Sequence, residues 1–293
     1  MQQSNQMFKP IVLEELITQH APSFAPWVPK MALNRLSSLL HLDEINTFLS
    51  EHFHDGPLEF VASVVEFLEL KLKTQGQTSL KDIPTNRPII VANHPLGGPE
   101  SLVMMHAVGK IDPKVKMVSK AILGELKPLK PLLIPIPTWN QRALVDQYRQ
   151  AFNSDMPIIM FPAGYCSRPL SNKVIFDLKW YSSFVRMARV YNRPILPVHI
   201  DGANSNKFYR LSSLRRALRI KVSFESLYLP DEMFKQRGKT ITLSCGQLIE
   251  PNQLPSDLSD DLLADRIRSY VYLLGQDNQR QFDATEASVL PLS

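Results

Sequence analysis

Short apolar runs alternate with longer stretches of helical periodicity through most of the chain. The runs at Arg87–Asn93, Ile158–Phe161 and Pro194–Ile200 are rich in β-branched residues, and each leads into a turn rich in Pro, Gly or polar residues. Runs of this kind are typical of buried parallel strands. The pattern therefore predicts an α/β fold with a mixed, largely parallel central sheet flanked by helices.

The helical periodicity is strongest near the two ends of the chain. Apolar stripes at Met31–Leu40 and Leu58–Leu72 predict helices before the first strand, and Ser259 caps a predicted helix at Asp260–Leu274. We expect a helical N-terminal region over residues 1–76 and an α/β domain over residues 77–293, packed as one compact unit.

The turn after the first run carries the first candidate chemistry. His94 follows the predicted strand, and Glu100 falls in the first turn of the next predicted helix, where the helix dipole favours an anion. A carboxylate that accepts a hydrogen bond from one imidazole nitrogen leaves the other free to remove a proton. The same spacing also fits a loop histidine beside a helix carboxylate with no chemistry.

Two further turns should lie in the same crevice, because the carboxyl ends of neighbouring parallel strands meet at one edge of a sheet. The second turn carries Cys166, Ser167 and Arg168, and the third carries Asn204. Arg168 is the best candidate to bind an anionic group. Cys166 is a weaker candidate nucleophile, since cysteine more often fills space as a small apolar side chain.

These motifs, taken in order, resemble the glycerolipid acyltransferases, a lysophosphatidate acyltransferase-like family. The similarity is greatest to a hemolysin-like bacterial branch related to ornithine-lipid and glycine-lipid O-acyltransferases. It extends from about Leu42 to Leu229. The segments that carry it are Asn93–Gly98, Phe161–Gly164, Ser167-Arg168, Asp177–Trp180, Asn204-Ser205 and Phe208-Tyr209.

The resemblance implies a peripheral membrane enzyme of lipid biosynthesis. In that family a histidine, here His94, takes the proton of a lipid hydroxyl, which attacks the thioester of acyl-ACP or acyl-CoA. Glu100 would orient His94, and no metal or cofactor is needed beyond the acyl co-substrate. The residues expected to bind substrate are Asn93, Gly97, Gly98, Gly164, Ser167, Arg168 and Asn204. The glycines could bring N–H groups to the oxyanion or could simply shape turns.

The chain departs from the family pattern at three places, one of which is Tyr165-Cys166, where relatives usually have an acidic residue and an apolar one. Glu100 stands where the branch has Asp, so the pair with His94 could be looser than in relatives. Ala163 replaces the glutamate of the broader family, which favours an acceptor without a phosphate. Both lysophosphatidate and a lyso-amino-acid lipid stay open as acceptors.

Charge and composition bear on where the protein acts. The formal net charge is +5, and the basic segment Arg210–Lys221 repeats leucines at helical spacing, which suits either an anionic membrane surface or a solvated helix. An acidic acyl carrier protein is a further partner for such charge. Two cysteines, no signal peptide and no long apolar run predict a protein on the cytoplasmic face of the inner membrane.

Other functions lack their motifs. The chain has no nucleophile elbow, no dinucleotide or phosphate-binding loop, no clustered zinc ligands and no nucleic-acid-binding motif. The alternative that stays open is a non-catalytic lipid- or acyl-carrier-binding protein that keeps an acyltransferase-like fold.

Overall fold

The structure is a computed structural model of the 293-residue chain. It describes residues 8–20, 29–82, 87–120, 123–124, 126–137, 141–169, 174–220, 223–288 and 290.

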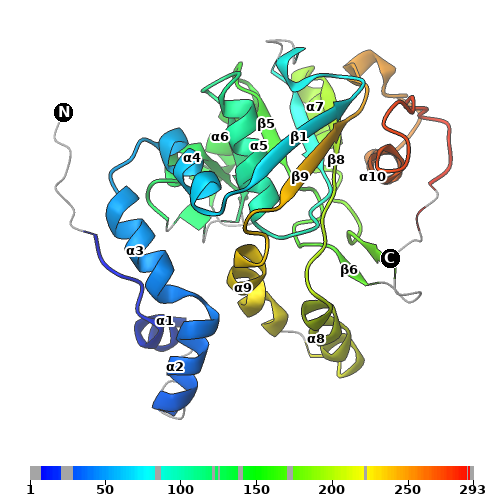
Figure 1. The fold of residues 1–293 in the computed structure, drawn as a ribbon. Helices are drawn as coiled ribbons and strands as arrows, with labels where there is room; N and C mark the ends of the chain where they lie inside the picture. The colour runs from blue at the N-terminus through cyan, green and yellow to red at the C-terminus, as the bar shows by residue number, and fades with distance from the viewer. Residues whose placement is uncertain are drawn as a thin grey trace.

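A seven-stranded sheet runs through the centre of the described structure (Figure 1). Its strand order is β1-β9-β8-β2-β5-β3-β4, and every neighbouring pair is parallel except β8 and β9. The strands are β1 (Lys71–Gly76), β2 (Ile89–Ala92), β3 (Lys116–Ser119), β4 (Leu133–Pro135), β5 (Ile158–Met160), β8 (Ile195–Ile200) and β9 (Thr240–Cys245). A small antiparallel pair joins β6 (Arg168–Pro169) to β7 (Ile175–Phe176).

Helices cover both faces of the sheet. Along β2, Ile90 and Ala92 point into one buried cluster, whereas Ile89 and Val91 point into the other, as the two-residue repeat of a strand requires. Helices α4 (Pro57–Phe67) and α5 (Pro99–Gly109) pack on the first face. Helices α6 (Arg142–Phe152), α7 (Ser183–Tyr191) and α10 (Asp260–Leu274) pack on the second. The predicted mixed α/β class, with a largely parallel sheet between helices, is confirmed.

The remaining helices lie outside these layers. They are α1 (Leu13–His20), α2 (Lys30–Leu39), α3 (Leu42–His52), α8 (Asn206–Ala217) and α9 (Leu229–Phe234). In the view of Figure 1, α8 and α9 hang below the sheet, and α1 to α3 lie to their left. No helix among the described residues is long and apolar enough to cross a membrane.

The three predicted strands correspond to β2, β5 and β8, and the helix predicted at Asp260–Leu274 is α10. The helix predicted over Leu58–Leu72 is too long, since α4 ends at Phe67. Glu69 takes a φ of 50°, which a helix cannot continue through, and the chain then extends as β1. Strand β1 pairs with β9, so the last residues of the region 1–76 belong to the sheet, and the division of the chain at residue 76 stays a prediction.

The topology brings the three polar turns to one edge. Strands β5 and β8 flank β2 and run parallel to it, so the carboxyl ends of all three point the same way. Helix α8 follows β8 and extends from that same edge. This edge is where open α/β sheets bind ligands.

Candidate active site

His94 lies two residues beyond the end of β2, in a loop tied to the neighbouring strand. The Asn93 side chain donates to the carbonyl of Ile200 at 2.9 Å and accepts from the Ile200 N–H at 2.7 Å. Asn93 is buried, so this amide bridge joins the ends of β2 and β8 and sets where the histidine loop begins. Its predicted contact with substrate stays a prediction.

Glu100 is fully buried and closes the same loop. Its Oε1 accepts the N–H groups of Leu96 and Gly97 at 2.8 and 2.9 Å, and its Oε2 accepts the N–H of Gly98 at 3.0 Å. Pro99 is the first residue of α5, where proline is favoured because a backbone N–H at that position has no partner within the helix. Glu100 then lies in the first turn, next to the loop that it binds. The turn requires glycine at Gly97, where φ is 89° and an added Cβ would lie 2.8 Å from a Leu229 methyl.

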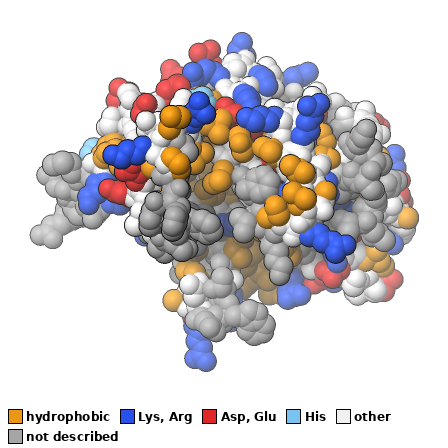
Figure 2. Space-filling model, turned by 90° about the horizontal axis from the view of Figure 1, so that it is seen from below, with side chains coloured by type: hydrophobic (Ala, Val, Ile, Leu, Met, Phe, Trp, Pro, Cys, Tyr) orange, Lys and Arg blue, Asp and Glu red, His pale blue; other side chains and the backbone are white. Residues whose placement is uncertain are grey.

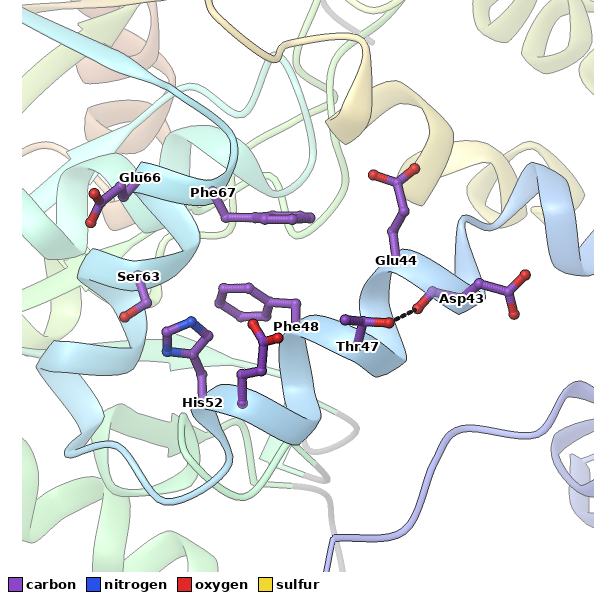
Figure 3. Close-up of a pocket in the computed structure, with 9 residues that line it drawn as sticks. Asp43, Glu44, Thr47, Phe48, His52, Ser63, Glu66 and Phe67 are labelled. Carbon is purple, nitrogen blue, oxygen red and sulfur yellow. Dashed lines mark hydrogen bonds between the residues drawn. The ribbon is translucent and has the colours of Figure 1, made fainter.

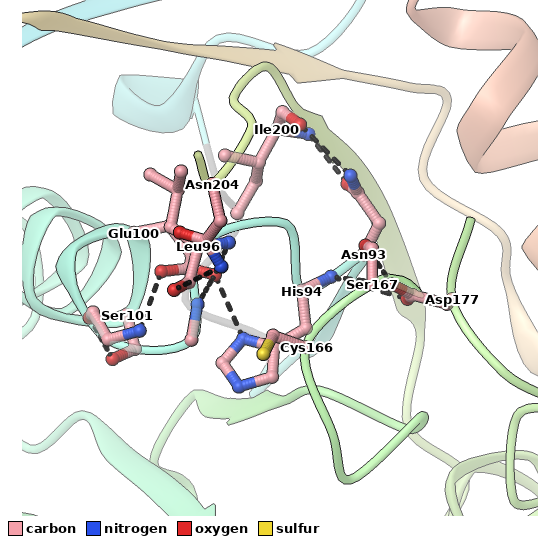
Figure 4. A network of polar contacts seen from close by, with 12 residues as sticks. Asn93, His94, Leu96, Glu100, Ser101, Cys166, Ser167, Asp177, Ile200 and Asn204 are labelled. Atoms are coloured by element: carbon pink, nitrogen blue, oxygen red, sulfur yellow. Dashed lines mark hydrogen bonds and ion pairs between the residues drawn. The ribbon is translucent and has the colours of Figure 1, made fainter. Parts of the chain in front are cut away.

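The same carboxylate contacts the histidine ring. His94 Nδ1 lies 3.0 Å from Glu100 Oε1, in a bent geometry that falls short of a regular hydrogen bond. Such contacts are often poorly aligned before substrate binds. The second ring nitrogen points away from Glu100 (Figure 4), and the His94 side chain is 16% exposed. The glutamate side chain at position 100 therefore reaches the His94 ring, although the related family has aspartate at this position.

The electrostatics favour an ionised Glu100. Burial raises the pKa of Glu100, but the His94 ring and the N–H groups of Gly97 and Leu96 lower it by more, so this pKa lies below its usual 4.5. An ionised Glu100 favours a proton on Nδ1, which leaves the other ring nitrogen free to accept a proton.

A second buried carboxylate, Asp177, holds the loop from the other side. It accepts the backbone N–H of His94 at 3.2 Å, the Ser167 hydroxyl at 2.6 Å and the Trp180 indole N–H at 2.9 Å. Ser167 completes the link by donating its own N–H to the His94 carbonyl at 2.7 Å. The turns after β2 and β5 are thus joined through one side chain (Figure 4).

Sequence reasoning assigned no role to Asp177. The Asp177–Trp180 motif was part of the resemblance, and that spacing was the signal, but its contact with His94 spans 83 positions and needs the fold to become visible. Burial raises the pKa of Asp177, and its hydrogen-bond donors offset this only in part. Arg268 and Tyr272 of α10 bond the Asp177 main chain and anchor it to the second helical layer.

Arg168 is not open to solvent. Its guanidinium donates to the Cys166 carbonyl at 2.9 Å, lies 3.4 Å from the Glu225 carboxylate and sits 4.6 Å from the centre of the Phe208 ring. Glu225 is fully buried and also pairs with Arg215 at 2.9 Å. The charge of Arg168 is therefore already met within the protein, and its predicted binding of a substrate anion stays a prediction.

The predicted oxyanion donors are also occupied. Gly97 and Gly98 donate to Glu100, and the Gly164 N–H donates to the Phe161 carbonyl at 3.0 Å. In this arrangement these N–H groups brace the turns. The part of all three glycines in substrate binding stays a prediction.

The other predicted residues hold the loops together. The Asn204 amide donates to the Leu96 carbonyl at 3.2 Å, and Ser167 is bound to Asp177. Cys166 is buried beside Arg168, and burial raises the pKa of its thiol while Arg168 opposes this only in part. A thiol that stays protonated is a poor nucleophile, so the structure disfavours the cysteine hypothesis.

A separate cavity of about 590 Å³ lies between α3 and α4 (Figure 3). Glu44, Glu66, Phe48 and Phe67 are among its lining residues, and none of those residues comes from the loops around His94. The described residues contain no group of three or more His, Cys, Asp or Glu side chains arranged to hold a metal.

Comparison with known proteins agrees with this site. The model of a family described as acyltransferase matches residues 15–278. The chain belongs to the acyltransferase family.

Curated relatives of this acyltransferase are lyso-glycine lipid O-acyltransferases. The protein of Bacteroides thetaiotaomicron is 34% identical over 268 residues, which cover 90% of this chain and 97% of the relative. The protein of Phocaeicola vulgatus is also 34% identical, with 90% and 95% covered. Among solved structures, the 1-acyl-sn-glycerophosphate (LPA) acyltransferase PlsC of Thermotoga maritima aligns with a TM-score of 0.41 and 18% identity, covering 90% of this chain and 94% of that one.

The acyltransferase assignment confirms the predicted family and makes the chain an enzyme. The non-catalytic alternative supposes that Glu100 and Tyr165 weaken the site. Glu100 Oε1 lies 3.0 Å from the His94 ring, so glutamate keeps the contact at this position.

We expect Glu100→Gln to lower kcat by at least about 100-fold, because a neutral amide does not hold the Nδ1 proton that leaves the other nitrogen basic. Steady-state kinetics on the purified protein measure this. Glu59→Gln is the matched control, since Glu59 also accepts a backbone N–H in the first turn of a helix but lies on α4. Wild-type kcat in Glu100→Gln would show that the pair is not used.

The lowered pKa of Glu100 also predicts acid sensitivity. Its folded-state pKa lies below the unfolded value near 4.5, so the ionised form stabilises the fold above that pH. The contribution is lost as the pH falls through the folded-state pKa. Urea unfolding across a pH series should show the free energy of unfolding falling more steeply below about pH 4.5 in wild type than in Glu100→Gln. Parallel curves would contradict an ionised Glu100 with a lowered pKa.

Asp177→Asn tests the link between the two turns. An amide nitrogen would face one of three donors, so we expect the His94 loop to shift and kcat to fall by about 10–100-fold. Because the reacting group rather than the acyl-donor site is displaced, KM for the donor should change little. Asp55→Asn is the control, since Asp55 accepts from Ser63 and contacts His52 away from this site. An unchanged kcat, or a loss confined to KM, would contradict this role.

Proposed function

We propose that this acyltransferase moves a fatty acyl group from a thioester, acyl-ACP or acyl-CoA, to the hydroxyl of a monoacylated lipid, with His94 as general base. The observation that carries the proposal is the buried Glu100 carboxylate 3.0 Å from a partly exposed histidine ring. The names of the curated relatives support a lyso-lipid acceptor.

The chemistry needs few protein groups. The His94 nitrogen that faces away from Glu100 takes the hydroxyl proton as the acceptor oxygen attacks the thioester carbonyl. The carbon–sulfur bond then breaks, and the proton on the imidazolium passes to the departing thiolate. Glu100 stabilises the positive ring between these steps, and a positioned base of this kind contributes about 10²–10⁴-fold to the rate.

Two observations favour a lyso-amino-acid lipid over lysophosphatidate as acceptor. The curated relatives at 34% identity are named for a lyso-glycine lipid. The broader family's glutamate is replaced by Ala163, which is buried, and the Arg168 guanidinium is already paired with Glu225. Because Glu225 already meets its charge, Arg168 is less available to a phosphate headgroup.

We further propose that the enzyme works at the inner face of the cytoplasmic membrane as a peripheral protein. Its acceptor and product are both lipids, and the chain carries a net charge of +5, which favours an anionic surface. An acidic acyl carrier protein remains a proposed partner for donor delivery.

The test is acyl transfer by purified protein to lyso-glycine lipid and to lysophosphatidate, with acyl-ACP and acyl-CoA as donors and mass spectrometry of the products. We expect a higher kcat/KM for lyso-glycine lipid, and a loss of about 10²–10⁴-fold in His94→Ala. His52→Ala is the control, because His52 also pairs with a carboxylate but lies on α3. Equal rates in wild type and His94→Ala would refute the base, and a preference for lysophosphatidate would refute the acceptor.

A further inference from the structure

Helix α8 extends from the edge of the sheet that carries His94, and its outer side is apolar and basic. Phe208, Tyr209 and Ser212 are buried against the body of the protein. Arg210, Leu214 and Leu218 follow one another at four-residue spacing on the opposite side, where Leu214 is 52% and Leu218 60% exposed.

The surrounding surface continues this character. Ile220 and Leu227 are also large exposed apolar side chains, and Leu227 is 55% exposed. We call the whole surface the α8 patch; it consists of Lys207, Arg210, Leu214, Leu218, Arg219, Ile220 and Leu227. Seen from below, the molecule shows hydrophobic side chains gathered beside lysine and arginine side chains (Figure 2). Lys221 of the predicted basic segment lies outside the described residues.

The segment that forms α8 and the turn after it carries no acidic residue to offset this charge. The sequence from Gly202 to Phe224 contains neither Asp nor Glu. The next carboxylate, Glu225, is fully buried and is neutralised by Arg168 and Arg215, so it contributes nothing to the surface. Exposed leucines beside lysine and arginine side chains are complementary to an anionic lipid surface, where the leucines enter the acyl region and the arginines reach the headgroups.

The patch is rigidly joined to the active-site loops. Ser205 caps α8 and bonds the Glu232 carboxylate of α9, and Phe208 packs against Cys166 and beneath the Arg168 guanidinium. Arg216 at the far end donates to the Pro169 carbonyl. Because the helix spans about 18 Å, a surface at its outer side lies a fixed and short distance from the histidine loop.

We propose that the α8 patch docks the enzyme on an anionic bilayer, with the active-site edge of the sheet toward the lipid. The inference rests on the proposed function, in which both acceptor and product are lipids. An acidic carrier protein is the competing occupant. The exposed Leu214 and Leu218 favour the bilayer, because they offer apolar insertion where a carrier protein would need only charge.

The test is co-sedimentation of the full-length protein with vesicles of equal parts phosphatidylglycerol and phosphatidylcholine. Leu214→Ser with Leu218→Ser should weaken binding at least about tenfold, and Arg210→Glu with Arg219→Glu should do the same. Leu72→Ser with Lys73→Glu is the matched control, an exposed leucine and lysine on the edge strand β1. This control should bind as wild type does, and thermal unfolding should show that all variants are folded.

The same leucine variant should acylate an acceptor presented in detergent micelles at the wild-type rate, because docking is then not needed. Undiminished vesicle binding by both patch variants overturns the inference, and so does a loss of acyl-ACP use without loss of vesicle binding, which would assign the patch to the carrier protein. If wild type binds vesicles through the patch yet acylates no acceptor, the proposed function fails while the docking surface stands.

Discussion

A buried carboxylate must be satisfied on all sides, and the active-site edge of this acyltransferase is organised around that requirement at Glu100. The side chain is fully buried, where an unpaired charge would be costly. Three successive backbone N–H groups, from Leu96 to Gly98, and the His94 ring meet that charge. The same contacts fold the loop tightly enough to return the histidine to the start of α5.

This requirement has a cost for catalysis. The loop N–H groups that could have met a substrate oxyanion are committed to Glu100, and the one at Gly164 is committed to the Phe161 carbonyl. The structure therefore orients the His94 ring more clearly than it provides free N–H donors for an oxyanion. Rate enhancement would then depend strongly on holding acceptor and thioester together at the His94 ring.

Asp177 is a second buried carboxylate whose hydrogen bonds join two turns at this edge of the sheet. It binds the backbone of the β2 turn, the Ser167 hydroxyl of the β5 turn and the Trp180 indole, and α10 holds its main chain. Two buried carboxylates thus set the histidine loop from opposite sides, one through the ring and one through the backbone. Phe208 of α8 packs against Cys166 and the Arg168 guanidinium in the turn after β5. The helix that carries the α8 patch is therefore in direct contact with one of the loops beside His94.

The sequence by itself determined the three strands β2, β5 and β8, the helix at Asp260–Leu274 and the pairing of His94 with Glu100, because these depend on local periodicity and on residues a few positions apart. The helix that ends at Phe67 was predicted too long from the sequence. Its apolar periodicity continues past Phe67 into the first residues of β1, so the pattern does not show where the helix ends. Only the tertiary structure decided that Arg168 faces Glu225 and that Asp177 reaches the His94 backbone, contacts that span 57 and 83 positions. Side chains so far apart in the chain meet only when the sheet order places their turns at one edge, and no local pattern encodes that order.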